Sequence, residues 1–209
     1  MKISALLLTT SLIAIAGTAS ATGTNKYYTS ITGEYIANAK ADGDISARDE
    51  TATISADYKN GWGGLAALGY NITPDFRAEI EGGYRELKAE RFSITNGETT
   101  YTASSNAKKK AFTAMGNVYY DIPTDTNFTP YIGAGIGWAH ETSDASNAFA
   151  YQGMLGLNYK VAANNTIFAG YRYIATTDFT NDYTISNVQV REKASIQGSA
   201  IDVGYRFNF

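Results

Sequence analysis

The stretch that decides the fold is SIQGSAIDVGYRFNF, residues Ser195–Phe209 at the end of the chain. Counted back from the last residue, every second side chain is large and apolar, and those between are small or polar. The apolar set is Phe209, Phe207, Tyr205, Val203 and Ile201. A period of two is the pattern of a β-strand with one apolar and one polar face. Such a strand needs an apolar environment along one side.

The composition indicates that the rest of the chain is built in the same way. The 209 residues include 20 Gly, 16 Tyr and 9 Phe but only 3 Pro, and the formal net charge is −3. Helix-forming residues are not gathered into heptad-like blocks, and alternation dominates instead, which is typical of an all-β protein. There is no basic excess of the kind that binds nucleic acid, so no nucleic-acid partner is expected.

The first residues differ from the remainder of the chain. Lys2 is followed by an apolar run over residues 3–16 and then by Ala19-Ser20-Ala21, which predicts a signal peptide (1–21) cleaved after Ala21. A transmembrane helix is the alternative, but the apolar run is shorter than the ~20 residues that a span needs. Residues 22–209 are expected to form one domain. Because the chain has no Cys, neither a disulfide nor a lipid-modified cysteine is expected.

Alternation recurs in eight segments along the chain, which we predict as strands. They cover residues 27–37, 61–72, 76–87, 111–122, 128–139, 149–161, 166–176 and 195–209. Short turns follow the second, fourth and sixth strands. Longer polar stretches follow the others and are predicted as loops, at 38–57, 88–110, 140–148 and 177–194. The chain is therefore expected to run up and down through neighbouring antiparallel strands.

An even number of strands with short turns at one end and long loops at the other is typical of an outer-membrane barrel. The predicted fold is all-β: an eight-stranded antiparallel up-and-down transmembrane β-barrel. A soluble lipocalin-like barrel or a sandwich would show the same periodicity with its apolar face inward. Mid-strand charges on the other face, aromatic residues at both ends of the apolar face and a closed sheet favour the membrane arrangement. The short turns are flanked by aromatic residues, predicted as a periplasmic girdle, in LGYNITPDF, VYYDIPTDTNF and LNYKVAANNTIF.

Two segments resemble a known family. FTPYIGAGIGWA (Phe128–Ala139) and GYRFNF (Gly204–Phe209) are similar to small outer-membrane barrel proteins of the opacity-protein and surface-antigen type, which are related in architecture to the OmpA transmembrane barrel. The resemblance implies a monomer in the outer membrane of a Gram-negative cell envelope. It also implies that Tyr205, Phe207 and Phe209 form the signal that the barrel-assembly machinery reads. The family includes adhesins, antigens and porin-like proteins, so the resemblance does not name one activity.

Eight charged residues, four of each sign, form the most informative constellation. By parity all of them face the lumen; they are Glu34, Glu79, Glu81, Asp202, Arg77, Arg85, Arg172 and Arg206. An eight-stranded barrel is only wide enough for side chains to fill it, and an isolated buried charge is costly. We therefore expect a salt-bridge network that plugs the barrel; a charged constriction in a narrow pore is the alternative. Gly133, Gly135 and Gly137 are expected on the inner face, where they leave room for bulky side chains opposite.

The long loops and their ends are the expected sites of interaction. Lys108, Lys109 and Lys110 are predicted at the outer rim, where they would either contact lipopolysaccharide phosphates or be a solvated loop end. Variable loops on a rigid barrel carry recognition. The leading prediction is a structural outer-membrane protein whose loops act in surface interaction, as an adhesin that meets a host-surface ligand or as an antigen. A narrow, low-conductance porin is the alternative.

Catalytic and metal-binding signals are weak. The single histidine, His140, is followed by Glu141-Thr142-Ser143, but no G-x-S-x-G motif is present. The chain has no Cys/His cluster for zinc and no EF-hand loop, and Asp42-Gly43-Asp44 is weak evidence for Ca²⁺. We expect a protein that is not an enzyme and that uses no cofactor or metal.

Overall fold

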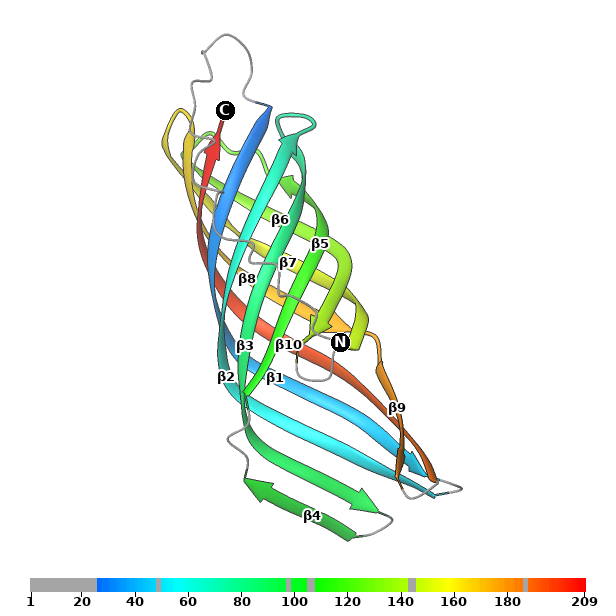
Figure 1. Cartoon of the computed structure of the whole chain (residues 1–209). Helices are drawn as coiled ribbons and strands as arrows, with labels where there is room; N and C mark the ends of the chain where they lie inside the picture. The colour runs from blue at the N-terminus through cyan, green and yellow to red at the C-terminus, as the bar shows by residue number, and fades with distance from the viewer. Residues whose placement is uncertain (1–25, 48–49, 97–98, 105–107, 143–145, 186–187) are drawn as a thin grey trace, which may run out of the picture.

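A computed structural model describes residues 26–47, 50–96, 99–104, 108–142, 146–185 and 188–209. The predicted signal peptide lies outside the described residues. Within them the chain forms one antiparallel sheet that closes on itself (Figure 1). Its strands are β1 (Tyr27–Ala47), β2 (Glu50–Asn71), β3 (Phe76–Asn96), β4 (Thr99–Ser104), β5 (Lys108–Asp121), β6 (Phe128–Glu141), β7 (Ser146–Ala162), β8 (Asn165–Thr176), β9 (Phe179–Ile185) and β10 (Val188–Asn208). No helix among these residues is long and apolar enough to cross a bilayer.

Eight of the strands form the ring, which confirms the predicted fold. Neighbours run in the order β1-β2-β3-β5-β6-β7-β8-β10, and β10 pairs with β1 to close the circle. The other two strands continue the walls of the ring at one end: β4 pairs with the last residues of β3, and β9 pairs with the first residues of β10.

The two ends of the barrel differ, as the sequence predicted. At the turn end, short connections at 72–75, 122–127 and 163–164 join successive strands. The last residue also lies at this end, where Phe209 N–H donates to the carbonyl of Tyr27 at 2.8 Å and Tyr27 N–H donates to the carbonyl of Phe209 at 3.3 Å. At the opposite hairpin end, the walls continue as long β-hairpins (Figure 1).

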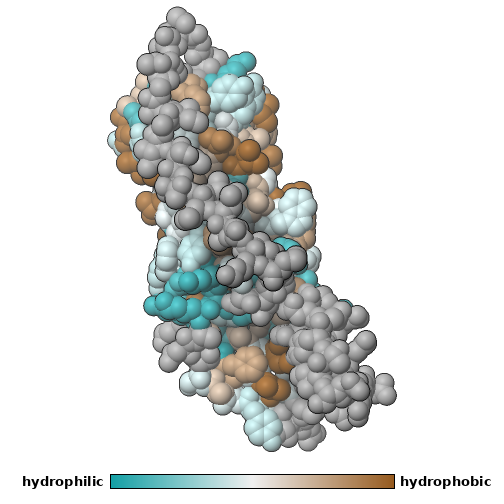
Figure 2. Space-filling view, viewed as in Figure 1, coloured by the Kyte–Doolittle hydropathy of each residue, from teal (hydrophilic) through white to brown (hydrophobic). Residues whose placement is uncertain are grey.

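The apolar faces of the strands point outward. In β5, for example, Phe112 and Val118 are exposed while Met115 and Asn117 are buried. Large apolar side chains stay exposed around the ring; Ile80, for instance, is 69% exposed. On the face seen in Figure 2, hydrophobic residues lie on the half of the barrel that carries the C-terminus. A soluble barrel would bury these side chains, so this arrangement excludes the soluble alternative.

Aromatic residues form a row at each end of the apolar band, as expected for the two membrane–water interfaces. At the turn end, neighbouring rings on adjacent strands lie 4.7–5.1 Å apart, in the pairs Tyr27–Tyr70, Phe76–Tyr120 and Phe128–Tyr159. At the hairpin end, the rings of Trp62, Tyr84 and Phe112 follow one another at 5.6 and 5.3 Å. We take the strand segments between these two rows as the membrane-spanning part.

Three of the four predicted loops are wrong, because most of their residues continue the strands. β1, β2, β3 and β10 are 21, 22, 21 and 21 residues long, far beyond the predicted bounds. The predicted loops at 38–57, 88–110 and 177–194 are rich in Thr, Ser and Ile, which suit a strand with one wet face. Only the stretch at 140–148 is close to its prediction, since β6 ends at Glu141 and β7 begins at Ser146.

Candidate functional site

The eight charged residues predicted for the lumen project into the barrel from β1, β3, β8 and β10. Arg172 and Asp202 are each 3% exposed, and the side chain of Glu79 is 6% exposed. They are placed there by strand parity alone, because every second residue of these strands faces inward. What the sequence could not give is the way in which they pair.

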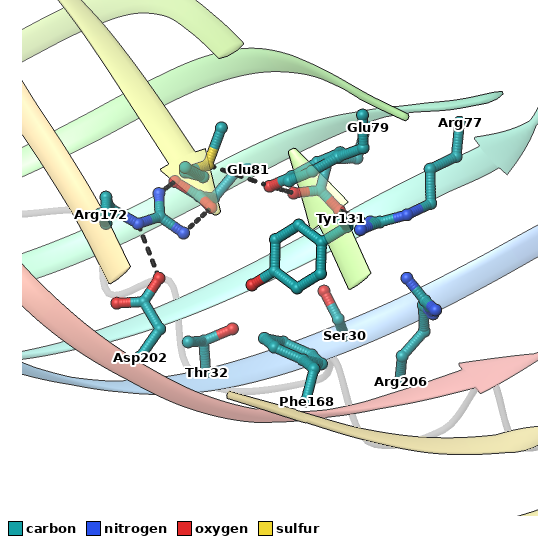
Figure 3. A pocket seen from close by; sticks show the side chains of 12 residues that line it. Ser30, Thr32, Arg77, Glu79, Glu81, Tyr131, Phe168, Arg172, Asp202 and Arg206 are labelled. Atoms are coloured by element: carbon teal, nitrogen blue, oxygen red, sulfur yellow. Dashed lines mark hydrogen bonds and ion pairs between the residues drawn. The ribbon is translucent and has the colours of Figure 1, made fainter. Parts of the chain in front are cut away.

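Arg172 is the centre of the network. Its Nη1 and Nη2 atoms donate to the two carboxylate oxygens of Glu81 at 2.8 and 3.0 Å, and its Nε donates to Asp202 Oδ2 at 2.8 Å (Figure 3). Nη1 also donates to the side-chain carbonyl of Gln152 at 2.9 Å. Bidentate guanidinium–carboxylate pairs are among the strongest hydrogen-bonded pairs in proteins. Arg172 thereby ties β8 to its neighbours β7 and β10 and, across the lumen, to β3.

A second pair lies one layer toward the hairpin end. Arg85 Nε donates to Glu34 Oε2 at 2.8 Å, and Arg85 Nη1 donates to Thr113 Oγ1 at 2.7 Å. The Glu34 side chain is 0% exposed, so its charge depends on this partner.

A third layer lies toward the turn end around Arg77. Its Nε donates to Asp121 Oδ2 at 2.9 Å, and its guanidinium lies 3.8 Å from the ring centre of Tyr119. The Tyr28 and Tyr119 hydroxyls donate to the two oxygens of Glu79 at 3.0 and 2.7 Å. Asp121 is the last inward residue of the predicted strand 111–122 and was missed there, and the tyrosines were missed because only charged side chains were considered for the lumen network. Their inward parity was the available signal.

Arg206 differs from the expectation of full pairing. It reaches no carboxylate within 4.0 Å among the described residues. Its Nη2 instead donates to Asn158 Oδ1 at 3.3 Å, and its guanidinium lies 5.4 Å from the Tyr28 ring centre. The cavity that remains between these layers measures about 20 Å³, which is space for about one water molecule.

Two of the inner glycines leave room for larger side chains opposite, as expected. A Cβ atom on Gly133 would collide with the ring of Tyr119, and one on Gly135 would collide with the amide of Asn117. Both neighbours contact Glu79, so the absence of side chains on β6 makes room for the polar network.

Beyond Arg85 the interior becomes apolar. A cavity of about 70 Å³ lies there, with an accessible surface made of apolar atoms of residues such as Ile36, Leu87 and Ile196. The ion-paired Lys109 and Glu141 also line it. Phe179, the first residue of β9, is 4% exposed and packs with alanines of β6 and β7. Sequence reasoning missed this residue because it falls in a predicted loop.

The polarity of the strand faces inverts at the same level. In β3 the inward residues Arg77, Glu81 and Arg85 give way to Leu87 and Ala89, which pack against a cluster around Tyr58 of β2. On the outward face, apolar residues give way to polar ones that form cross-strand hydrogen bonds. These bonds are Thr53–Asp44 at 3.1 Å, Ser55–Asp42 at 2.8 Å, Ser93–Thr102 at 3.1 Å and Thr95–Thr100 at 3.0 Å.

Two of the three lysines at the rim form ion pairs with carboxylates. Lys108 Nζ is 2.9 Å from Glu86 Oε1, and Lys109 Nζ is 2.7 Å from Glu141 Oε1. The hydrogen bond from Lys108, with the nearby charges of Lys110 and Lys88, holds the pKa of Glu86 below its usual value against a smaller opposing effect of burial. These ion pairs reduce the positive charge that faces outward, and lipopolysaccharide contact by Lys108, Lys109 and Lys110 stays a prediction.

The remaining predicted residues are placed as follows. His140 is exposed, and its Nδ1 lies 2.9 Å from Asn147 Oδ1. In the described ranges no group of three or more His, Cys, Asp or Glu could hold a metal ion. Tyr205, Phe207 and Phe209 sit at the turn end of β10, where the rings of Phe207 and Phe209 are 6.4 Å apart.

The fold, the outward apolar band and the two aromatic rows define the chain as an outer-membrane β-barrel protein. A family profile described as "Surface antigen" matches residues 18–209, and the chain belongs to this family. It is 31% identical over 175 residues to the outer membrane protein PagN of Salmonella typhimurium, which covers 71% of this chain and 73% of that protein.

Solved structures support the same class. The outer membrane protein OprG from Pseudomonas aeruginosa has a TM-score of 0.62 at 12% identity, covering 88% of this chain and 96% of that chain. Neisserial surface protein A has a TM-score of 0.51 at 20% identity, covering 88% and 97%. At these identities the likeness shows the fold. The family and these proteins are described as surface or outer-membrane proteins, not as enzymes. Because the short turns of outer-membrane barrels lie in the periplasm, the turn end is the periplasmic end.

Proposed function

We propose that the protein is a structural outer-membrane barrel that closes its own lumen and uses the hairpins beyond the membrane for surface interaction, as an adhesin or an antigen. The observation that carries the proposal is that the strands fill the lumen at the level of the membrane and continue beyond it as exposed walls. The membrane-level lumen is filled by the layers around Arg77, Arg172 and Arg85. The walls formed by β10, β1, β2 and β3 continue outward with a polar outer face that a partner can reach.

The alternative of a narrow porin has less support. A pore needs a continuous water-filled path, whereas the described lumen holds three ion-paired layers and a cavity of about 20 Å³ between them. The next cavity toward the outside has an accessible surface of apolar atoms, although the ion-paired Lys109 and Glu141 also line it, and apolar constrictions resist wetting. We therefore favour the plug over the pore.

Two narrower proposals follow from the positions of the remaining residues. Tyr205, Phe207 and Phe209 close the ring against the start of β1, which suits a signal that the barrel-assembly machinery reads during the last step of closure. We further propose that the protein acts as a monomer, because the closed ring needs no partner within the membrane.

The surface role is tested by shortening one hairpin. Removing residues 42–55 and joining Ala41 to Ala56, which pair across β1 and β2, through Asn-Gly leaves the membrane-level barrel intact. Bacteria that display this variant should adhere to mammalian cell layers no better than bacteria without the protein. A control with Gly153→Ala, where a Cβ meets nothing within 4 Å, should adhere like the parent. Unchanged adherence of the shortened variant at equal surface level would overturn the proposal.

A further inference from the structure

The outer part of the barrel is an incomplete ring. β6 ends and β7 begins near the membrane, at Glu141 and Ser146, while the neighbouring walls continue as β4 and β9. Within the described residues β4 pairs with β3 alone and β9 pairs with β10 alone (Figure 1). The extension is therefore an open sheet in the order β4-β3-β2-β1-β10-β9, and β4 and β9 are its edges.

The β4 edge lacks the usual protection against strand addition. Thr99–Ser104 has the sequence TTYTAS, without charge or proline, and it pairs with β3 without a bulge. In an antiparallel pair, alternate residues direct their N–H and C=O groups toward the partner strand and away from it. About half of the β4 main-chain groups therefore point away from β3. The β9 edge is less open, because Phe179 is buried in the lumen and the strand contacts β7.

The side chains of β4 specify what an added strand would meet. On the inner face Tyr101 pairs with Ile94 of β3, and these side chains are 71% and 37% exposed. Ile94 is paired in turn with Ile54 of β2, which is 7% exposed, so the apolar face continues inward from the edge. On the outer face Thr100 and Thr102 form hydrogen bonds with β3. A strand beside β4 would find an apolar face, a polar face and a row of main-chain partners.

We infer that the edge of β4 binds an extended segment of a partner protein, whose side chains alternate between apolar and polar and which adds to the sheet by main-chain pairing. The absence of charge on β4 favours a segment without net charge. The inference rests on the proposed surface role and names the mode of contact. Addition of a strand to β4 would leave the membrane-level barrel unchanged.

The probe is a peptide with the sequence of residues 89–96, AERFSITN, whose counterpart in the chain pairs with β4 from the other side. The full-length protein in lipid nanodiscs should bind the labelled peptide, measured by fluorescence anisotropy. A scrambled peptide of the same composition, with the alternation broken, should bind at least about tenfold more weakly. Equal binding of the two peptides, or binding of neither, would overturn the inference.

A pair of matched variants locates the contact. Thr100→Lys with Thr102→Lys places two charges on the edge strand, where they oppose strand addition. The control, Ser93→Lys with Thr95→Lys, places the same charges at the directly paired positions of β3. The edge variant should weaken peptide binding about tenfold or more, and the control should change it less than about twofold. Equal effects of the two variants would show a charge effect and would contradict edge pairing.

The adherence assay separates the two proposals. If the edge variant adheres like the parent while the hairpin-shortened variant does not, the surface role stands and the β4 inference is wrong. If the shortened variant also adheres normally, the surface role itself is wrong.

Discussion

The membrane-level lumen and the outer wall are made of the same strands, but the outward faces of these strands meet opposite surroundings. In the membrane the outward face meets lipid, so polar residues turn inward and must find partners there. Beyond the membrane the outward face meets water, so the polar residues face out, and the inward face of β3 carries Leu87 and Ala89 in place of Arg77 and Arg85. Each part keeps the period of two, but the apolar face of the strand points outward in the membrane and inward beyond it. Alternation alone therefore defines a strand, whereas the identity of the apolar face depends on the solvent outside.

The largest effect on stability is expected from removing the central cation of the lumen. Arg172→Ala leaves Glu81 and Asp202 buried without their shared partner, and we expect the free energy of unfolding to fall by about 3–5 kcal/mol. The measurement is urea unfolding of the refolded protein in lipid vesicles, followed by tryptophan fluorescence. Arg91→Ala, on the exposed outer part of β3, is the matched control and should change stability by less than about 1 kcal/mol. An unchanged midpoint for Arg172→Ala would mean that the network does not hold the barrel.

A smaller effect is expected from crowding the lumen. Gly133→Leu would push the Tyr119 ring away from Glu79, and overpacking of this kind costs about 1–3 kcal/mol. Gly153→Ala on the outward face of β7 meets no atom within 4 Å and should change stability by less than about 1 kcal/mol. The same unfolding experiment compares them, and equal effects at the two positions would refute the account of the inner glycines.

The smallest effect is expected at the exposed rim, where it should depend on pH. Lys108 lowers the pKa of Glu86, so the pair stabilises the folded state at pH values above the ordinary pKa of a glutamate, ~4.3. This stabilisation is lost as the pH falls through the lowered pKa of the folded state. Lys108→Gln should therefore lower the unfolding midpoint slightly at pH 7 and not at pH 3. A difference that persists at pH 3 would assign the effect to something other than this ion pair.

Much of the barrel could be predicted from the sequence because alternation and parity are local. The strands, the short turns and the inward direction of residues such as Glu34 and Arg172 follow from a period of two. The strand lengths could not be predicted by the same reasoning, since polar stretches were equated with loops. The sequence Asn96-Gly97, a hairpin signal, stands where β3 ends ahead of β4 and was overlooked.

The pairing of charges within the lumen could not be predicted from the sequence, for a geometric reason. Which cation meets which carboxylate depends on the stagger of strands across the ring; Arg172 and Glu81, for example, are 91 residues apart. The bulges near Ile36 and Tyr58 also shift the phase of β1 and β2, so parity counted from the membrane part fails beyond them. Phe179 falls in a segment predicted as a loop, so its packing with alanines of β6 and β7 in the outer lumen had no local signal.

Single-channel recording in a planar bilayer tests the central claim most directly. The account predicts that the refolded protein, with folding verified by a heat-dependent gel shift, gives no regular conductance steps, because the ion-paired layers and the apolar chamber close the lumen. Regular and reproducible steps from the parent protein would contradict it. They would show that the lumen opens to ions and would make the narrow porin the better description.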